Sequence, residues 1–309
     1  MRFIGHTAQS AVGENMTLKY SESDRALARA AYETLEPFHV VAYFSPDIKA
    51  ACADTGLDFH GWYVGARGAP LGPCDASVVA AAFFNFSPAV VGPGWDAAKA
   101  VGLEVVNDRR YQMLDETLGR ALGDHVGNPV LDELADRYAQ KAADLPMGGR
   151  TLAAAWANSK PPTQPHVRLW HSIAIVREWR GDAHIAALVT AGLDRLEALV
   201  LHEAQHPDPT VRRRLLGKKL VMVTRGWSED DWSAAAANLR ARGLVEQAES
   251  GEILTAAGAD LYNHIEELTD DAAAAAWCTD GDTEQLLTAT EPFVKSVIDA
   301  GILPGTKKK

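Results

Sequence analysis

Hydrophobic residues recur at intervals of three and four along most of the chain, and this spacing predicts a mostly α-helical protein. The first predicted helix begins at Ser21, a good N-cap, and ends at Pro37. The second begins with Ser45 and Pro46 and ends at Gly56. The amphipathic stretches as a whole predict helices over residues 21–37, 45–56, 107–122, 128–144 and 149–158, and the apolar stretch "CDASVVAAAFFNFSP" predicts a buried helix over 74–88.

Two segments interrupt the helical pattern. Residues 59–73, "FHGWYVGARGAPLGP", place glycines and prolines among aromatic residues, which predicts a loop or a short β-ribbon. Residues 159–165, "SKPPTQP", have the composition of a linker. After this linker the pattern predicts a helical hairpin, with helices over about 165–180 and 183–205. We expect the turn at Arg180-Gly181-Asp182, with Asp182 as the cap of the second helix.

The last third of the chain has the order helix, two short strands, helix. Ser228 and Asp231 form a capping-box pattern at the start of a helix that runs to about Arg242 and ends at Gly243. The segments "LVEQ" and "ILT" around "AESGE" predict two strands and a turn, and a helix follows from about Ala256. This order is the plan of a winged helix.

We therefore expect a mostly α fold with a C-terminal winged-helix unit and a short β-wing. An N-terminal helical unit, for which a diverged second winged helix is one alternative, would precede a central helical hairpin. The expected units are a flexible extension at 1–20, the N-terminal unit at 21–158, the hairpin at 165–205, the winged-helix unit at 211–300 and a basic tail at 301–309.

Residues 239–270, "LRARGLVEQAESGEILTAAGADLYNHIEELTD", resemble the wing region of MarR-type winged-helix proteins. A longer set of motifs is similar to an actinobacterial helix-turn-helix family of unassigned function, over about residues 24–280. These motifs are "YFSP", "GWYVGARGAPLGP", "FFNFSPAVV", "HVRLWHS", "REWRGDAHIAALVTAGLD" and "TRGWSEDDW". The resemblance to MarR-type proteins implies a ligand-responsive, dimeric transcriptional regulator.

The charge of the chain argues against that regulator. The formal net charge is −11, and an acidic chain is repelled by nucleic acid unless its bases gather in one patch. Residues 228–252, which would form the recognition helix and the wing, contain six acids and two bases. The opposing evidence is a run of bases that could flank this unit: Arg212, Arg213, Arg214, Lys218 and Lys219. We expect DNA binding to be lost, and keep the regulator as the alternative function.

The amino-acid composition is that of an ordinary globular protein. The chain has 309 residues, of which 47% are hydrophobic and 23% charged, so it can bury a sizeable core. Three cysteines without C-x-x-C spacing fit a reducing compartment, and we expect the cytoplasm. The longest apolar runs are too short to span a bilayer, so we expect no membrane association.

Residues 202–206 read H-E-x-x-H, the zinc-peptidase pattern, in which two histidines on one helical face share a metal. Pro207 directly follows His206 and disfavours the α conformation there, so we expect His206 to lie beyond the helix end. Nothing marks a third ligand. A zinc hydrolase through His202, Glu203 and His206 is therefore the least favoured of our hypotheses, and we expect no metal.

Candidate chemistry lies in two other segments. In the first, Arg67 stands between glycines and near Trp62 and Tyr63, a combination that suits a carboxylate, a phosphate or a planar ligand. The alternative is that Arg67 pairs with an internal acid.

The second segment places Trp170, His171, Arg177 and Glu178 on adjacent stripes of one helix. Asp182 and His184 follow within fourteen residues of His171. His171 and His184 are candidate acid/base groups, and Glu178 and Asp182 could orient them. The alternative for His171 is a hydrogen-bonded core histidine.

We hypothesise that the two segments share one small-molecule pocket between the N-terminal unit and the hairpin. Its ligand-binding residues would be Trp62, Tyr63, Arg67, Trp170, Arg177 and Asp182, and its catalytic residues His171, Glu178 and His184. No nucleotide-binding or hydrolase motif is present, so the cofactor stays unknown. The protein would be a small-molecule-binding protein or a cofactor-independent enzyme, with a homodimer as the expected assembly.

Overall fold

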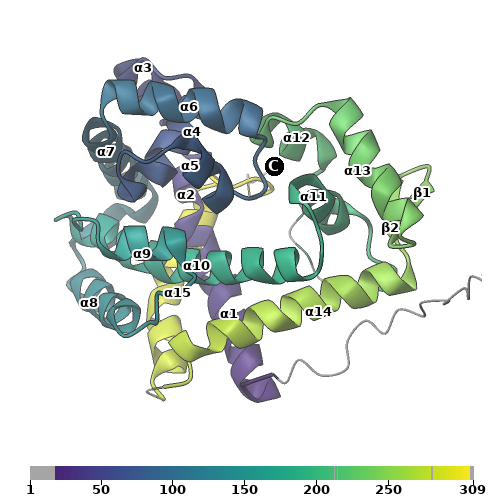
Figure 1. The fold of residues 1–309 in the computed structure, drawn as a ribbon. Helices are drawn as coiled ribbons and strands as arrows, with labels where there is room; N and C mark the ends of the chain where they lie inside the picture. Colours follow the sequence, from purple (N-terminus) through teal and green to yellow (C-terminus); the bar gives the residue numbers. More distant parts are fainter. Residues whose placement is uncertain (1–17, 212, 214, 280, 307–309) are drawn as a thin grey trace, which may run out of the picture.

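The helix α10 (Pro165–Thr190) runs through the middle of the molecule, and α8, α9 and α14 pack against it (Figure 1). The structure is a computed structural model that describes residues 18–211, 213, 215–279 and 281–306. The other helices are α1 (Glu22–His39), α2 (Val41–Phe44), α3 (Ile48–Thr55), α4 (Phe59–Gly68), α5 (Ala76–Ala82), α6 (Pro88–Val101), α7 (Leu103–Leu122), α8 (Val130–Ala143), α9 (Thr151–Ala157), α11 (Arg195–Glu203), α12 (Lys218–Arg225), α13 (Glu229–Ala241), α14 (Ala256–Ala273) and α15 (Thr283–Asp299). The strands β1 (Val245–Ala248) and β2 (Gly251–Leu254) form an antiparallel hairpin.

Local sequence signals located most helix ends correctly. The side chain of Ser21 accepts a hydrogen bond from the Asp24 N–H and completes a capping box at the start of α1, and Ser228 does the same with Asp231 at the start of α13. Gly56 ends α3 in the left-handed conformation, with φ of 70°. The N-cap of α3 is Asp47 rather than Ser45, whose hydroxyl instead accepts the Asp47 N–H at 3.0 Å.

Residues 59–68 are a helix, so the predicted loop or β-ribbon is wrong there. Asp58 caps α4 by accepting the Gly61 N–H at 2.7 Å. The glycines serve close packing: a Cβ on Gly65 would lie 2.6 Å from the Ala98 Cβ of α6, and one on Gly68 would lie 3.0 Å from the Trp95 ring. Tertiary packing therefore outweighs the low helix propensity of glycine in this segment.

The predicted turn at 180–182 is also wrong, because α10 continues to Thr190 and only the short α11 follows it. Asp182 does not cap the next helix. Its Oδ2 accepts the N–H groups of Leu152 and Ala153, both at 3.0 Å, in the first turn of α9. Gly181 stays helical inside α10. The predicted end of the first helix at Pro37 is also early, because α1 continues to His39. The fixed φ of proline is compatible with a helix, and its missing N–H removes only one backbone hydrogen bond.

The described residues form two hydrophobic cores. The larger core joins α1–α10 with α15, and the smaller core lies among α11–α14 and the end of α10. In the smaller unit α12 and α13 are joined by the short turn at 226–228, and the hairpin follows α13. Gln205 pairs with Ile253 and extends this hairpin by one bridge. None of the helices in the described part of the chain is long and apolar enough to cross a membrane.

The end of α12 joins the two units. The Ser87 N–H donates to the Arg225 carbonyl at 2.9 Å, and Trp227 Nε1 donates to the Asn85 carbonyl at 2.9 Å. Gly226, with φ of 71°, lies directly against the Val90 side chain of α6. These contacts fix the small unit beside the segment between α5 and α6.

Candidate functional site

A cavity of about 600 Å³ lies between the two cores. Its walls come from α1, α2, α4, α10, α12 and α15, from the segment 82–86, from Arg213, Leu215 and Leu216 before α12, and from residues 303–306, which follow α15. The aromatic part of the wall consists of Tyr32, Tyr43, Phe44, Phe59, Tyr63, Phe83, Phe84 and Phe86.

Four of the described arginines line this cavity: Arg213 donates to the backbone carbonyls of His202 and Ala204, and Arg67 and Arg177 are held in ion pairs. Arg67 of α4 donates to both carboxylate oxygens of Glu178, at 2.9 and 2.7 Å, and its guanidinium lies 4.8 Å from the centre of the Phe83 ring. Arg177 donates to Glu36 of α1 at 3.2 and 3.3 Å. Burial alone would raise the pKa of Glu178, but Arg67 and Arg177 outweigh it and lower that pKa to about 2. Glu178 and Glu36 are therefore ionised, and each carboxylate is already bound to an arginine.

Arg225, at the end of α12, has no such ionic partner. Among the described residues, no carboxylate lies within 4.0 Å of its guanidinium. Its side chain instead lies over the rings of Phe86, 4.4 Å from the ring centre, and Tyr63, at 5.6 Å. Burial, together with the charges of Arg67 and Arg177, lowers the pKa of Arg225 from its ordinary value. The cavity thus contains a partly desolvated positive charge without a counter-charge.

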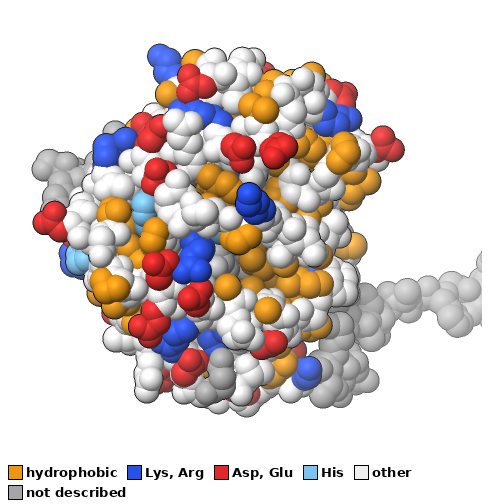
Figure 2. Space-filling model, turned by 90° about the vertical axis from the view of Figure 1, so that its left-hand side faces the viewer, with side chains coloured by type: hydrophobic (Ala, Val, Ile, Leu, Met, Phe, Trp, Pro, Cys, Tyr) orange, Lys and Arg blue, Asp and Glu red, His pale blue; other side chains and the backbone are white. Residues whose placement is uncertain are grey.

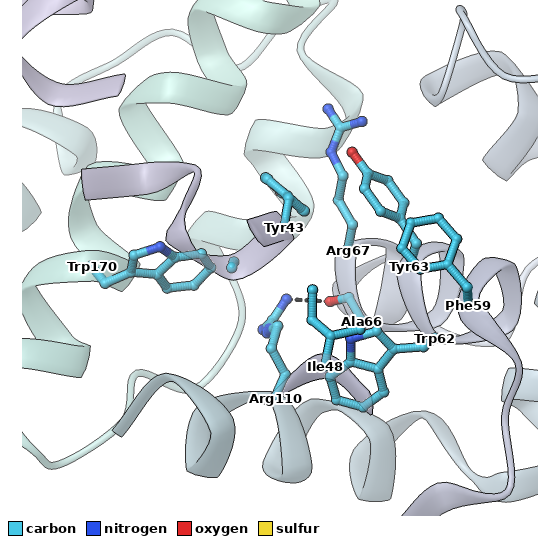
Figure 3. Close-up of a pocket in the computed structure, with 10 residues that line it drawn as sticks. Tyr43, Ile48, Phe59, Trp62, Tyr63, Ala66, Arg67, Arg110 and Trp170 are labelled. Atoms are coloured by element: carbon cyan, nitrogen blue, oxygen red, sulfur yellow. Dashed lines mark hydrogen bonds between the residues drawn. The ribbon is translucent and has the colours of Figure 1, made fainter. Parts of the chain in front are cut away.

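Tyr63 and Arg67 lie side by side on α4, and Figure 3 shows the Tyr63 hydroxyl and the Arg67 guanidinium pointing the same way. The Tyr63 ring also packs on Tyr43, with centres 5.0 Å apart. Behind them is a small space of about 10 Å³, which is room for about one water molecule. Arg110 closes this space and donates to the Ala66 carbonyl (Figure 3).

The predicted ligand-binding residues separate into two groups. Tyr63, Arg67 and Arg177 line the cavity. Trp62 and Trp170 are buried and touch only the small space beside Arg110; Trp170 Nε1 donates to the His39 carbonyl at 2.8 Å. Asp182 binds the first turn of α9 instead. Glu178, a predicted catalytic residue, lies behind Arg67 and orients it.

The two candidate acid/base histidines lie outside the residues that line the cavity. His171 Nδ1 and the Tyr111 hydroxyl form a hydrogen bond of 2.8 Å, and burial, helped by the charge of Arg110, lowers the pKa of His171 to about 3. His184 Nδ1 donates to the Thr269 hydroxyl at 3.0 Å, and burial lowers the pKa of His184 to about 4. The structure therefore does not bring these histidines together with Arg67, and both are neutral side chains that join α10 to its neighbours.

Sequence reasoning missed Arg225, the residue with the most unusual surroundings in this cavity. Its sequence context, "VTRGW", is that of an ordinary basic residue at a helix end. Its neighbours Tyr63 and Phe86 come from segments about 140 to 160 residues away in the chain. No local pattern reports a contact of that kind.

The exposed start of α13 is acidic. Glu229, Asp230 and Asp231 are exposed at the start of α13. Of the nearby bases, Arg242 pairs with Glu197 at 3.1 Å and Lys218 pairs with Glu229, whereas Lys219 is exposed. Arg213 donates to two backbone carbonyls, whereas Arg212 and Arg214 lie outside the described residues. On a different face, shown in Figure 2, acidic and basic side chains are interspersed, and the coloured atoms form no extended basic area there.

The H-E-x-x-H motif does not form the helical pair that a zinc site needs. The helix α11 ends at Glu203, so His206 lies beyond it, as expected from Pro207. The Glu203 carboxylate accepts the N–H groups of Leu216, at 3.3 Å, and Gly217, at 2.8 Å. Within the described ranges, no group of three or more potential ligand side chains could hold a metal ion.

Comparison with curated proteins found no match, and neither did comparison with solved structures. A family model, described as a helix-turn-helix family, matches residues 28–304. The match covers most of the chain and includes both α12 and α13 and every helix that lines the cavity. The chain therefore belongs to this helix-turn-helix family.

Proposed function

We propose that the protein binds a small organic anion in the cavity between the two cores. The observation that carries this proposal is Arg225, a partly desolvated guanidinium that faces the cavity without a carboxylate among the described residues. Leaving a charge in such surroundings is costly unless a partner compensates it. A carboxylate or phosphate matches the planar donor fork of arginine, and the rings of Tyr63 and Phe86 suit an apolar or aromatic body.

The remaining charged groups support the same ligand. Arg67 and Arg177 line the cavity with their positive ends held in place by Glu178 and Glu36. Because both carboxylates are already neutralised by these pairs, Arg225 leaves the site with an excess of positive charge. A cavity of about 600 Å³ also lies within the roughly 300–1,000 Å³ of typical small-molecule sites. Tyr63, Arg67, Arg177 and Arg225 are the proposed ligand contacts.

The lining favours binding over catalysis. None of the described residues that line the cavity is a histidine or cysteine. The pKa of Glu36 is lowered because Arg177 and His39 outweigh the effect of its burial, so this carboxylate is a poor proton acceptor. We assign Glu178, Trp62, Trp170 and Asp182 to support of the site, and His171 and His184 to the packing around α10.

A ligand-responsive transcriptional regulator is the second candidate. It is supported by the position of Arg225 at the end of α12, the helix directly before α13. In this proposal the fold is a MarR-like winged helix, the assembly a dimer in the cytoplasm, and a ligand at Arg225 would bias α12. The acidic start of α13 favours the first proposal, a binding protein on a scaffold that no longer uses DNA.

Isothermal titration calorimetry with 2-naphthoate, a planar aromatic carboxylate, tests the proposed function. The uncharged 2-naphthamide controls for the carboxylate. Arg225→Met keeps an unbranched apolar side chain over Phe86 and removes the charge, and Arg240→Met on the exposed side of α13 is the matched control. We expect 2-naphthoate to bind the parent protein and Arg240→Met, and to bind Arg225→Met about 10- to 100-fold more weakly, the loss of a charge-assisted hydrogen bond.

The stability of the free variants separates function from folding. Removing an uncompensated charge should leave the free energy of unfolding of Arg225→Met unchanged or raise it. Equal binding of 2-naphthoate by Arg225→Met and the parent protein, or equal binding of the acid and the amide, would contradict the proposal.

A further inference from the structure

The polarity of the cavity changes from its inner end to its mouth. At the inner end, the side chains of Arg67, Glu178 and Glu36 are 12%, 1% and 9% exposed, respectively. At the mouth, Phe59, Leu220 and Ile298 are 36%, 37% and 38% exposed. Ligand sites usually place their polar groups to fix orientation within a mainly apolar wall. Here the charge lies inside and the apolar surface reaches solvent.

The apolar mouth is a concentration of otherwise scattered side chains. Among the described residues, eight large hydrophobic side chains are exposed. Four of these eight line this one cavity: Phe59, Leu215, Leu220 and Ile298. They come from α4, the segment before α12, α12 itself and α15, so no single amphipathic helix accounts for the cluster. Exposed apolar side chains that gather at one opening indicate a ligand or partner that covers them.

The helix α12 gives the length of the path between the two ends. Leu220 and Thr224, one helical turn apart, both line the cavity, and Arg225 ends the same helix. Five residues of α-helix span about 7.5 Å. A ligand whose anionic group reaches Arg225 must therefore extend at least about this far along α12 before it meets Leu220 and the mouth. Leu303 and Pro304 continue the apolar wall on the opposite side.

We infer that the ligand is an elongated amphipathic anion, bound with its charged group at Arg225 and its apolar chain leaving along Leu220, Ile298 and Phe59. This inference rests on the proposed function and specifies the class of ligand. The orientation follows from the charge inside and the apolar mouth, since the reverse orientation would place the charged group against exposed hydrocarbon and the chain against paired ions.

A series of straight-chain carboxylates tests the inference: butanoate, octanoate and dodecanoate, titrated into the full-length protein below the concentrations at which they form micelles. We expect the dissociation constant to fall by about fourfold for each methylene that is buried. Dodecanol, which has the chain without the charge, should bind more weakly than dodecanoate. The double variant Leu220→Asn/Ile298→Asn should weaken dodecanoate binding by at least tenfold and leave the binding of the short butanoate unchanged.

Val105→Asn is the matched control, because Val105 is a 54% exposed side chain of α7 away from the cavity. It should leave every affinity unchanged. Affinity that does not depend on chain length, or a mouth variant that binds dodecanoate as the parent does, would overturn the inference while 2-naphthoate binding still upholds the proposed function. If no anion of any length binds, or if Arg225→Met binds them all as the parent does, the proposed function falls as well.

Discussion

Arg67 and Glu178, which are 111 residues apart in the sequence, form a two-pronged ion pair between α4 and α10. The Glu178 side chain is 1% exposed, so water does not stabilise its charge. The pair positions Arg67 at the cavity wall and leaves the Glu178 carboxylate without capacity for a ligand. The predicted catalytic role of Glu178 is therefore less well supported than a role in holding Arg67.

Breaking this pair from one side should be costly. Glu178→Gln leaves two partly buried guanidinium groups, those of Arg67 and Arg177, short of a counter-charge. We expect the free energy of unfolding to fall by about 3–5 kcal/mol, as for other buried pairs that lose one partner. Urea denaturation of the parent, Glu178→Gln, Arg67→Met and the double variant Arg67→Met/Glu178→Leu measures this. The double variant should lose less free energy of unfolding than the two single variants lose in total. Strictly additive losses would show that Arg67 and Glu178 are not energetically coupled.

The contact between Gly226 and Val90 should be intolerant of a single methyl group. A Cβ on Gly226 would lie 2.3 Å from the Val90 Cγ1, and the φ of 71° adds strain for any other residue. Gly243 is the matched control, because it has nearly the same φ, 70°, and nothing within 4 Å of an added Cβ. Thermal unfolding should show a larger loss for Gly226→Ala than for Gly243→Ala, by about 1–3 kcal/mol. Equal losses would mean that the two units separate freely at this point.

His171 should make the folded protein sensitive to acid. Its pKa of about 3 in the folded protein lies below the 6.5 of an unperturbed histidine, so in this range the unfolded chain binds a proton that the folded protein does not. Its contribution to stability is therefore complete above about pH 6.5 and declines as the pH falls from 6.5 towards 3. The slope should be at most about 1.4 kcal/mol per pH unit.

His171→Asn retains an oxygen that can accept the Tyr111 hydroxyl and removes the titrating group. Urea denaturation at pH 4.5, 5.5 and 6.5 should give a shallower dependence on pH for this variant than for the parent. The difference in slope is the readout, whatever the absolute stability of the variant. Parallel curves would show that His171 is protonated within the fold.

The acidic surface of the helix-turn-helix unit predicts that the protein does not shift duplex DNA in a mobility-shift assay, even at low salt. Reversing the charge of Glu229, Asp230 and Glu246 to lysine should create weak, salt-sensitive binding, since phosphate contacts dominate non-specific affinity. The control makes the same change in net charge at exposed acids outside this unit: Glu104→Lys, Asp108→Lys and Glu133→Lys. A shift by the parent protein would favour the regulator.

Local chemistry predicted much of the fold. The capping boxes at Ser21 and Ser228 and the left-handed Gly56 depend on neighbours within a few residues, and each helix end lies close to where these signals placed it. The prediction of a loop at 59–68 was wrong because the glycines of this segment allow close packing of α6, which lies about 30 residues further along the chain. The prediction of a turn at Gly181 was wrong for a similar reason. The carboxylate of Asp182 accepts backbone N–H groups of α9 and does not cap a helix that begins after it.

The candidate site was predictable only in part. Tyr63 and Arg67 line the cavity, and their glycine-rich segment, with aromatic residues near an arginine, carries a local signal of ligand chemistry. Arg177 also lines the cavity and was predicted from its position on one helix with Trp170. Neutral buried histidines produce the same sequence pattern as catalytic ones, so His171 and His184 could not be separated from them by spacing alone. Arg225 carried no local signal, since only the packing of α12 against segment 82–86 gives it its surroundings.

One face of α12 packs in the small core and another lines the cavity, and this separation has an evolutionary consequence. Val221 faces the small core, whereas Leu220, Thr224 and Arg225 face the cavity, so substitutions at adjacent residues of α12 affect different parts of the structure. Mutations on the cavity side can change which molecule is held without disturbing the core that sets the angle between α12 and α13. A lineage could therefore diversify its ligands rapidly while its overall architecture stays recognisable.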